Sequence, residues 1–306
     1  MKQCALEAKC VGGAVSEAST QITPTVRIKK LPNLPKPEQT RVFAIANQKG
    51  GVGKTTSTVN LAAAMALSGL HVLVVDIDPQ GNASTALAIE HPVGTPDVYS
   101  VLVEGKPLSA IVQSCPTIPG LFVAPATVDL TGAEIELVSV VAREYRLARA
   151  IDGYIAEHKT KHGRQIDYVL IDCPPSLGLL TLNALVAAKE VLIPIQCEYY
   201  ALEGVGQLIA NVELVREHLN PLLDVSTILM TMFNSTTKLS QQVVEEVRSH
   251  FGDRVLTAVV PRAVRLSEAP SYSQTIFTYD GSSIGAQSYL AAATEITNKI
   301  IGTKHD

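Results

Sequence analysis

The chain has 306 residues, of which 46% are hydrophobic, 18% charged and 5% aromatic, and its formal net charge is −4 at pH 7. This length provides for one large or two ordinary domains with a well-buried core, and the composition excludes a disordered, a collagen-like or a repeat protein. The slightly acidic balance also argues against a protein whose whole surface is basic enough to bind nucleic acid.

The first 40 residues differ in composition from those that follow. Residues 23–40 hold four prolines and four cations with little periodic apolar pattern, and such compositions usually stay solvated. We therefore predict a flexible N-terminal arm over 1–40 ahead of one folded domain over 41–306. An unstructured leader is favoured over an arm that touches DNA or a partner. Because Glu7 and Lys9 interrupt the apolar run that a signal peptide needs, we expect a soluble cytoplasmic protein.

From residue 41 onward, short β-branched runs alternate with segments in which apolar residues recur three and four apart. This alternation predicts a doubly wound α/β fold, in which a mostly parallel sheet carries helices on both faces. Ligands of such folds bind at the carboxyl ends of the strands. The predicted strands span 41–47, 71–78, 121–126, 167–173, 190–196 and 227–233. The predicted helices span 54–68, 129–159, 178–188, 201–219, 239–251 and 285–303.

A glycine-rich turn, NQKGGVGKTT, joins the first predicted strand to the first helix. Glycines let several backbone N–H groups point at one centre, and the helix adds the positive end of its dipole, so the turn suits an anion. Lys54 would reach the β- and γ-phosphates, and the Thr55 hydroxyl would ligate magnesium. Gln48 stands where an ordinary P-loop has its first glycine, and a second lysine, Lys49, precedes the glycine pair. The predicted nucleotide contacts in this turn are Lys49, Gly50, Gly51, Val52, Gly53, Lys54, Thr55 and Thr56.

The run KGGVGKTT resembles the deviant Walker A motif of the ParA/MinD group of P-loop ATPases. The resemblance implies ATP and Mg²⁺ as cofactors, and hydrolysis of ATP to ADP and phosphate. It also implies that both Lys49 and Lys54 are catalytic. In this family the extra lysine, here Lys49, reaches across a nucleotide-sandwich dimer to the partner's phosphates. Lys49 would then neutralise transition-state charge only when two copies meet, which couples hydrolysis to formation of a homodimer.

Two other predicted strands end in acidic residues. The run DIDPQGN places Asp76 further inward and Asp78 closer to the glycine-rich turn. An aspartate there can position a water or a hydrated magnesium ion, or simply begin a turn. The run matches the family's DxDPQGN motif, whose water-positioning aspartate falls on Asp78. The run YVLIDCPPS has the pattern of a Walker B strand, so Asp172 would hold magnesium through a water.

Three runs in the C-terminal half, PIQCEYYALEGVGQL, TMFNSTTKLSQQVVEEV and PRAVRLSEAPSYSQ, resemble the ParA/Soj chromosome- and plasmid-partition branch of this family. The resemblance therefore covers residues 41–302. It implies that Asn234 and the segment starting at Pro261 flank the adenine. This chain departs from the family at Ala263 and Thr236, where Asn and Arg are common, so neither position supplies those side-chain contacts.

The resemblance further implies a nucleoid-associated protein that binds DNA non-specifically as an ATP-bound dimer. It also implies a ParB-type centromere-binding protein as a partner, which stimulates hydrolysis and so releases the dimer from DNA. Residues 201–306 hold eight Lys or Arg against eleven Asp or Glu, so DNA binding would depend on a local patch. Any one of these cations taken alone is more often a solvated surface residue. The predicted DNA contacts are Arg262, Arg265, Lys238 and Arg248, of which the first two are favoured.

Other functions compete with partition. A MinD-like ATPase that cycles on membranes needs a basic amphipathic C-terminal helix, but the predicted helix over 285–303 carries only Lys299 inside it, so we expect no membrane partner. A nitrogenase-type iron protein needs paired cysteines around a bridging cluster, whereas Cys115 and Cys173 lie in unrelated contexts. A ParA-like ATPase that positions a protein cargo, and a nucleotide-sensing adaptor without turnover, would share the same motifs.

Overall fold

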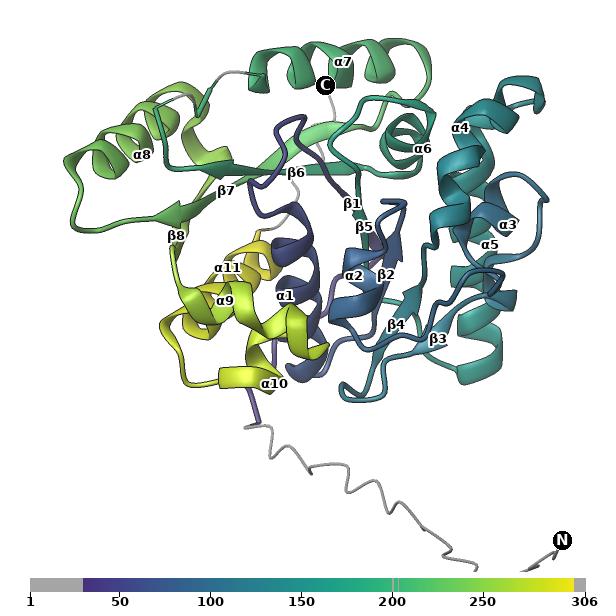
Figure 1. Ribbon diagram of the computed structural model, residues 1–306, viewed down its shortest axis with the longest axis horizontal. Coiled ribbons are helices and arrows are strands. Elements are labelled where there is room, and N and C mark those ends of the chain that lie inside the picture. The colour runs from purple at the N-terminus through teal and green to yellow at the C-terminus, as the bar shows by residue number, and fades with distance from the viewer. Residues whose placement is uncertain (1–29, 200, 203, 300–306) are drawn as a thin grey trace, which may run out of the picture.

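The computed structural model describes residues 30–199, 201–202 and 204–299, and an eight-stranded sheet lies at its centre in the order β3-β4-β2-β5-β1-β6-β7-β8 (Figure 1). Neighbouring strands are parallel, except that β3 pairs antiparallel with β4 at one edge. The predicted doubly wound fold is thereby confirmed. The strands are β1 (Arg41–Ile45), β2 (Val72–Asp76), β3 (Gln113–Ser114), β4 (Leu121–Ala124), β5 (Tyr168–Asp172), β6 (Glu190–Gln196), β7 (Asp224–Phe233) and β8 (Val255–Pro261).

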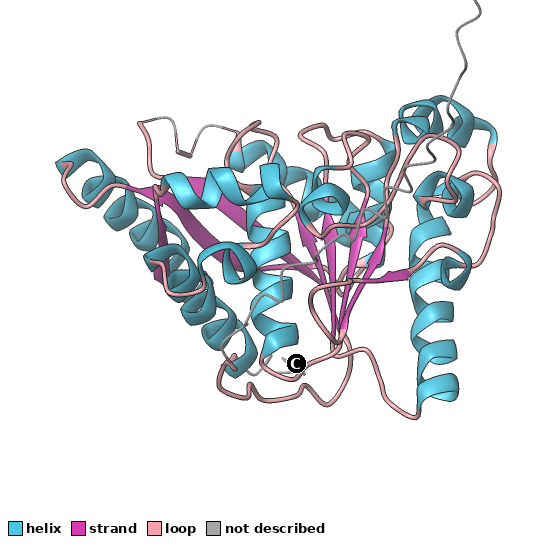
Figure 2. Cartoon of the chain, turned by 60° about the horizontal axis from the view of Figure 1, so that its bottom comes forward, coloured by secondary structure: helices cyan, strands magenta, loops and turns pink. Residues whose placement is uncertain are grey.

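Helices cover both faces of this sheet, as Figure 2 shows. Along β1, Val42 and Ala44 enter one apolar core while Phe43 and Ile45 enter the other, which is the alternation of a strand buried on both faces. The face of the sheet that carries Val42 packs against α3 to α8. The face that carries Phe43 packs against α1, α2 and α9 to α11. The helices are α1 (Lys54–Leu67), α2 (Asn82–Ala86), α3 (Val98–Leu102), α4 (Ala133–Glu136), α5 (Arg146–His162), α6 (Leu179–Ala187), α7 (Val205–His218), α8 (Lys238–Phe251), α9 (Val264–Glu268), α10 (Ile276–Asp280) and α11 (Ile284–Asn298).

The single helix predicted over 129–159 is wrong, because the segment is divided before α5 begins. Val140 is extended and Ala142 has a φ of 53°, so the backbone leaves helical geometry at both positions. Val138, Val140 and Val141 lie at this break, and β-branched side chains lose rotamer freedom in a helix. Three short turns of 3-10 helix occupy the segment: η2 (Val128–Gly132), η3 (Leu137–Ser139) and η4 (Arg143–Tyr145).

The sequence prediction missed the two edge strands, β3 and β8. The outer edge of β8 is covered by side chains instead of a further strand. Glu295 of α11 accepts hydrogen bonds from the backbone N–H groups of Thr257, at 2.7 Å, and Ala258, at 2.6 Å. Arg248 of α8 donates to the Thr257 carbonyl at 3.0 Å. These partners block the pairing of another chain with this edge.

The last residues of the predicted arm pack against the domain. Leu34 is buried, and its backbone N–H donates to the Ser68 carbonyl at 3.2 Å. The Thr40 hydroxyl donates to the Ile166 carbonyl at 2.6 Å. The packed chain therefore begins before Arg41, whereas residues 1–29 of the predicted arm lie outside the described residues.

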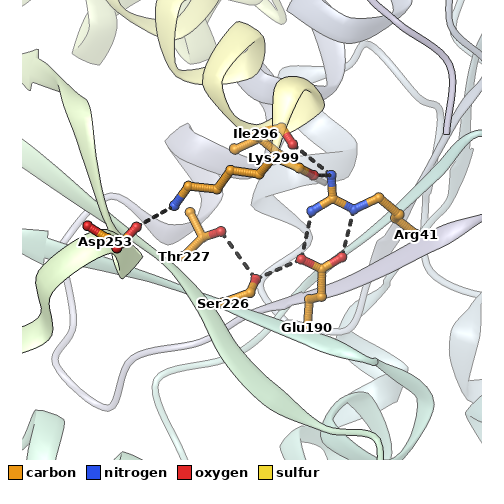
Figure 3. A network of polar contacts seen from close by, with 7 residues as sticks. All are labelled: Arg41, Glu190, Ser226, Thr227, Asp253, Ile296 and Lys299. Atoms are coloured by element: carbon orange, nitrogen blue, oxygen red, sulfur yellow. Dashed lines mark hydrogen bonds and ion pairs between the residues drawn. The ribbon is translucent and has the colours of Figure 1, made fainter. Parts of the chain in front are cut away.

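A buried ion pair joins the amino ends of β1 and β6, opposite the edge at which ligands are expected (Figure 3). The guanidinium of Arg41 donates to both carboxylate oxygens of Glu190, at 2.8 and 2.7 Å, and to the Ile296 carbonyl at 2.6 Å. The Ser226 hydroxyl donates to Glu190 at 2.7 Å. Strands β1, β6 and β7 are thereby tied to the end of α11.

Candidate nucleotide-binding site

The glycine-rich turn lies between β1 and α1 at the carboxyl edge of the sheet (Figure 1). Gly51 and Gly53 have φ angles of 73° and 89°, a left-handed backbone that glycine adopts without strain. Gly53 directly precedes Lys54, the first residue of α1. The turn therefore leads straight into the positive end of a 14-residue helix, which is the arrangement that favours a phosphate group.

Neighbouring strands hold this turn in place. The Asn47 side-chain amide donates to the Pro194 carbonyl of β6 at 2.8 Å, and its oxygen accepts from the backbone N–H of Lys49 at 3.0 Å. The Thr231 hydroxyl of β7 donates to the Val52 carbonyl at 2.8 Å. The backbone of the turn is thus preorganised by two strands that lie far from it in sequence.

Lys54 is almost fully buried beneath the turn. Its ammonium group donates to the Lys49 carbonyl at 3.3 Å. Burial lowers the pKa of Lys54, while the nearby carboxylates of Asp172 and Asp78 oppose that shift. The structure therefore brings the predicted phosphate-binding lysine close to both predicted acidic residues.

Asp172 is fully buried at the end of β5 and meets two hydroxyl groups from α1. One carboxylate oxygen accepts from Thr55 at 2.7 Å and the other from Thr58 at 2.9 Å. Burial, reinforced by the charge of Asp76, raises the pKa of Asp172. A hydroxyl and a carboxylate side by side are the oxygen ligands that Mg²⁺ takes, directly or through waters. The residues present therefore fit a magnesium ion at Thr55 and Asp172; the Thr58 contact was not predicted from the sequence.

The two aspartates of the DIDPQGN run differ in exposure, as their spacing predicted: Asp76 is 0% and Asp78 9% exposed. Asp76 accepts from both the backbone N–H and the hydroxyl of Ser84, at 2.9 and 2.7 Å, and from the backbone N–H of Asp78 at 3.2 Å. Asp76 therefore anchors the loop that carries Asp78. Sequence reasoning did not identify Ser84.

A pocket of about 330 Å³ opens beside the turn. Of the two positions predicted to flank the adenine, Pro261 lines this pocket and Asn234 does not. The Asn234 side chain accepts hydrogen bonds from the backbone N–H and the hydroxyl of Thr236. Met232, which the sequence did not single out, also lines the pocket. Its φ is 52°, and the pairing of β7 with β8 shifts register at this point. The lining also includes Gly53, Thr56, Ala263 and Tyr289.

The predicted DNA contacts lie on α8, α9 and the loop before α9, and three of the four have partners within the chain. Arg262 pairs with Glu198 at 2.8 Å, and Arg265 lies 3.8 Å from Asp280. Arg248 holds the edge of β8, as described above. Lys238 begins α8 and is exposed.

Three further observations bear on the competing functions. In α11, Tyr289, Ala293 and Ile296 are buried, so this helix packs against the domain as predicted. No helix among the described residues is long and apolar enough to cross a membrane. Cys115 and Cys173, the cysteines considered for a bridging cluster, are both buried within the chain, and burial raises the pKa of the Cys173 thiol.

Known proteins resemble this chain over most of its length. A family model described as an AAA domain matches residues 40–225. The chain is 50% identical over 256 residues to the sporulation initiation inhibitor protein Soj of Bacillus subtilis, covering 84% of this chain and 98% of that protein. It is also 50% identical over 260 residues to the chromosome partitioning protein ParA of Myxococcus xanthus, covering 85% of this chain and 88% of that protein.

A solved structure supports the fold. Cobyrinic acid a,c-diamide synthase from Mycobacterium smegmatis, with a bound ATP analogue and magnesium, superposes with a TM-score of 0.70 at 37% sequence identity. The match covers 84% of this chain and 94% of that one.

Proposed function

Since this chain belongs to the Soj/ParA family of chromosome-partitioning ATPases, we propose that ATP binding joins two copies into a sandwich dimer that binds DNA non-specifically. Hydrolysis, stimulated by a ParB-type centromere-binding protein, then releases the DNA. The cycle is a population switch, in which each ligand favours one oligomeric state. The names of the relatives support the partition role, and the residues of the site support the individual steps.

The observation that carries this proposal is the convergence of Lys54, Thr55 and Asp172 beneath one glycine-rich turn. Lys54 and the loop amides bind the phosphates of ATP. Thr55 and Asp172 would hold the magnesium ion, which when bound neutralises charge on the phosphates. The pocket lined by Pro261 and Met232 lies against Gly53 and Thr56 and takes the nucleoside.

Hydrolysis is assigned to Asp78 and to Lys49 of the opposite copy. Asp78 is buried at the carboxyl edge near Lys54 and orients the attacking water. The backbone of Lys49 is fixed by Asn47 and Lys54, yet its side chain is partly exposed. Its ammonium group can therefore reach the phosphates of a facing copy and stabilise the charge that develops in the transition state.

DNA contacts are assigned to Arg262, Arg265 and Lys238, at the carboxyl side of β7 and β8. Arg248 is a weaker candidate in this structure, because its guanidinium is engaged by the β8 carbonyls. Glu198 is exposed and Asp280 is partly exposed, and ion pairs at the surface contribute only about 0–1 kcal/mol. DNA phosphates can therefore displace them.

The assignment of hydrolysis is tested by ATPase assays at several protein concentrations. The turnover per chain should rise with protein concentration in the wild type, and both Lys49→Ala and Asp78→Ala should lower it by about 100-fold or more while leaving ATP binding intact. A mixture of the two variants should recover activity, because one mixed site then carries Asp78 of one copy and Lys49 of the other. Wild-type turnover in either variant would contradict the assignment.

A further inference from the structure

A row of exposed aliphatic residues lies on the segment between β4 and α5. Ile135, Val138 and Val141 are 80, 63 and 86% exposed. Single exposed aliphatics are common on protein surfaces, but three of them within seven residues concentrate apolar surface on one short segment. We refer to Ile135, Val138 and Val141 as the α4 row.

Opposite charges lie at the two ends of the α4 row. Glu136 is exposed beside Ile135, and its carboxylate is held by the Tyr99 hydroxyl at 2.8 Å. At the other end, Arg146 and Arg149 occupy the first turns of α5 without an ion pair or hydrogen bond to any described residue. These two arginines line a pocket of about 430 Å³ that also includes Val141, Glu157 and Lys106, and Lys106 pairs with Glu104.

The backbone presents the α4 row rather than burying it. The strained Ala142, with its φ of 53°, separates the row from α5, so that Val141 projects outward while Leu147 enters the core. A non-glycine residue in this conformation costs of order 1 kcal/mol and tends to occur at functional positions. A strained backbone residue and exposed apolar side chains thus occur in the same short segment.

The α4 row also lies on the edge of the sheet that carries the nucleotide site. Its segment leaves the carboxyl end of β4, which is parallel to β2 and its Asp78 loop. Helix α4 lies beside α6 (Figure 1), and Glu134 reaches Gly178 in the loop that follows Asp172. Two copies that face each other across their nucleotides would therefore bring their α4 rows toward one another.

We propose that the α4 row is a contact between two copies of this chain. Ile135 of each copy enters the pocket beside Val141 of the other, and Glu136 faces Arg149 of the other copy. A two-fold contact requires a self-complementary surface, and this segment carries both signs of charge around an apolar centre. The inference rests on the proposed ATP-dependent dimer and names part of its interface.

The first test measures dimerisation of the full chain by sedimentation velocity with magnesium and a non-hydrolysable ATP analogue. Ile135→Glu should raise the dimer dissociation constant by about tenfold or more, because a buried apolar anchor becomes a charge. Leu222→Glu is the matched control: Leu222 is 67% exposed but precedes β7, at the opposite edge of the sheet. It should leave the constant unchanged, and both variants should bind nucleotide as the wild type does.

A charge exchange tests the pairing itself. Glu136→Arg and Arg149→Glu should each weaken the dimer, and the double variant should regain most of the lost affinity, since the two charges then attract again. A double variant as weak as the sum of the two single changes would overturn the pairing.

The outcomes also separate this inference from the proposed function. A wild-type chain that dimerises with the analogue, together with an Ile135→Glu variant that dimerises equally well, overturns the inference and leaves the proposed function standing. The inference is also overturned if Ile135→Glu dimerises normally but its ATP hydrolysis is no longer stimulated by the centromere-binding protein. The α4 row would then be a contact for that partner. A wild-type chain that stays monomeric contradicts the dimer of the proposed function.

Discussion

At the residue scale, the site depends on a small set of side chains that meet only when distant strands come together. Lys54, Thr55 and Asp172 were predictable because a lysine and threonine after a glycine-rich turn, and an aspartate ending an apolar strand, have few other uses. Met232 and Ser84 were not, because the pocket and the Asp76 anchor depend on strand order and on the irregular pairing of β7 with β8. No local pattern in the sequence encodes either feature.

One residue outside the site allows a pH test of the structure. His158 is 4% exposed and packs against His71, His162 and Phe122, with ring centroids 5.7, 4.5 and 5.0 Å away. Burial, and then the positive charges that His162 and His71 would carry, lower the pKa of His158 to about 4. Its ring is therefore neutral in the folded chain where an unfolded chain would already bind a proton.

The sign of the effect follows from this lowered pKa. Above pH 6.5 neither state binds the proton, and as the pH falls toward 4 only the unfolded state gains it, so stability is lost. We expect His158 to account for a loss of about 2 kcal/mol between pH 7 and pH 5. Urea unfolding of wild type and His158→Phe at both pH values measures this as a smaller loss in the variant. Equal losses would show that His158 does not titrate differently in the two states.

At the element scale, the apolar runs predicted the interior strands well, because a strand buried on both faces reads as a continuous apolar segment. The break between α4 and α5 was not predicted, since apolar spacing continues through Val140 and Val141 although the backbone leaves the helix there. Strand β8 was also missed, although its run VLTAVVP is apolar and β-branched. The side chains that cover its outer edge, Arg248 and Glu295, lie in other helices and could not be assigned to it from the sequence.

The edge of β8 provides the test at this scale. Glu295→Ala should lower the free energy of unfolding by about 2 kcal/mol, because two backbone N–H groups lose their acceptor. Glu295→Gln keeps one acceptor oxygen and should lose about half as much. Chemical denaturation measures both changes. A neutral Glu295→Ala substitution would mean that water satisfies this edge equally well.

At the scale of the whole molecule, the Arg41–Glu190 pair joins the first strand of the domain to its middle strands and its last helix (Figure 3). Glu190→Ala should cost about 3–5 kcal/mol, because Arg41 would keep a buried charge without its partner. Glu104→Ala, which breaks the exposed pair with Lys106, should cost less than about 1 kcal/mol. Similar costs for the two variants in denaturation experiments would contradict the burial of the Arg41 pair.

The distribution of charge over the whole molecule sharpens the DNA hypothesis. A net charge of −4 rules out binding through a basic surface as a whole. The candidate arginines of one copy pair with acidic residues, so a single copy offers few free cations to DNA. Pairing two copies doubles the number of contacts, and the affinity should then depend on both nucleotide and salt.

The most direct test of this account is DNA binding by the full chain with ATP, with ADP and without nucleotide, for the wild type and Lys49→Ala. We predict salt-sensitive binding by the wild type with ATP alone. Lys49→Ala should bind ATP but lose DNA binding, because its two copies no longer hold each other's phosphates. Equal DNA affinity of the wild type in all three conditions, or wild-type DNA binding by Lys49→Ala, would contradict an ATP-dependent dimer as the form that binds DNA.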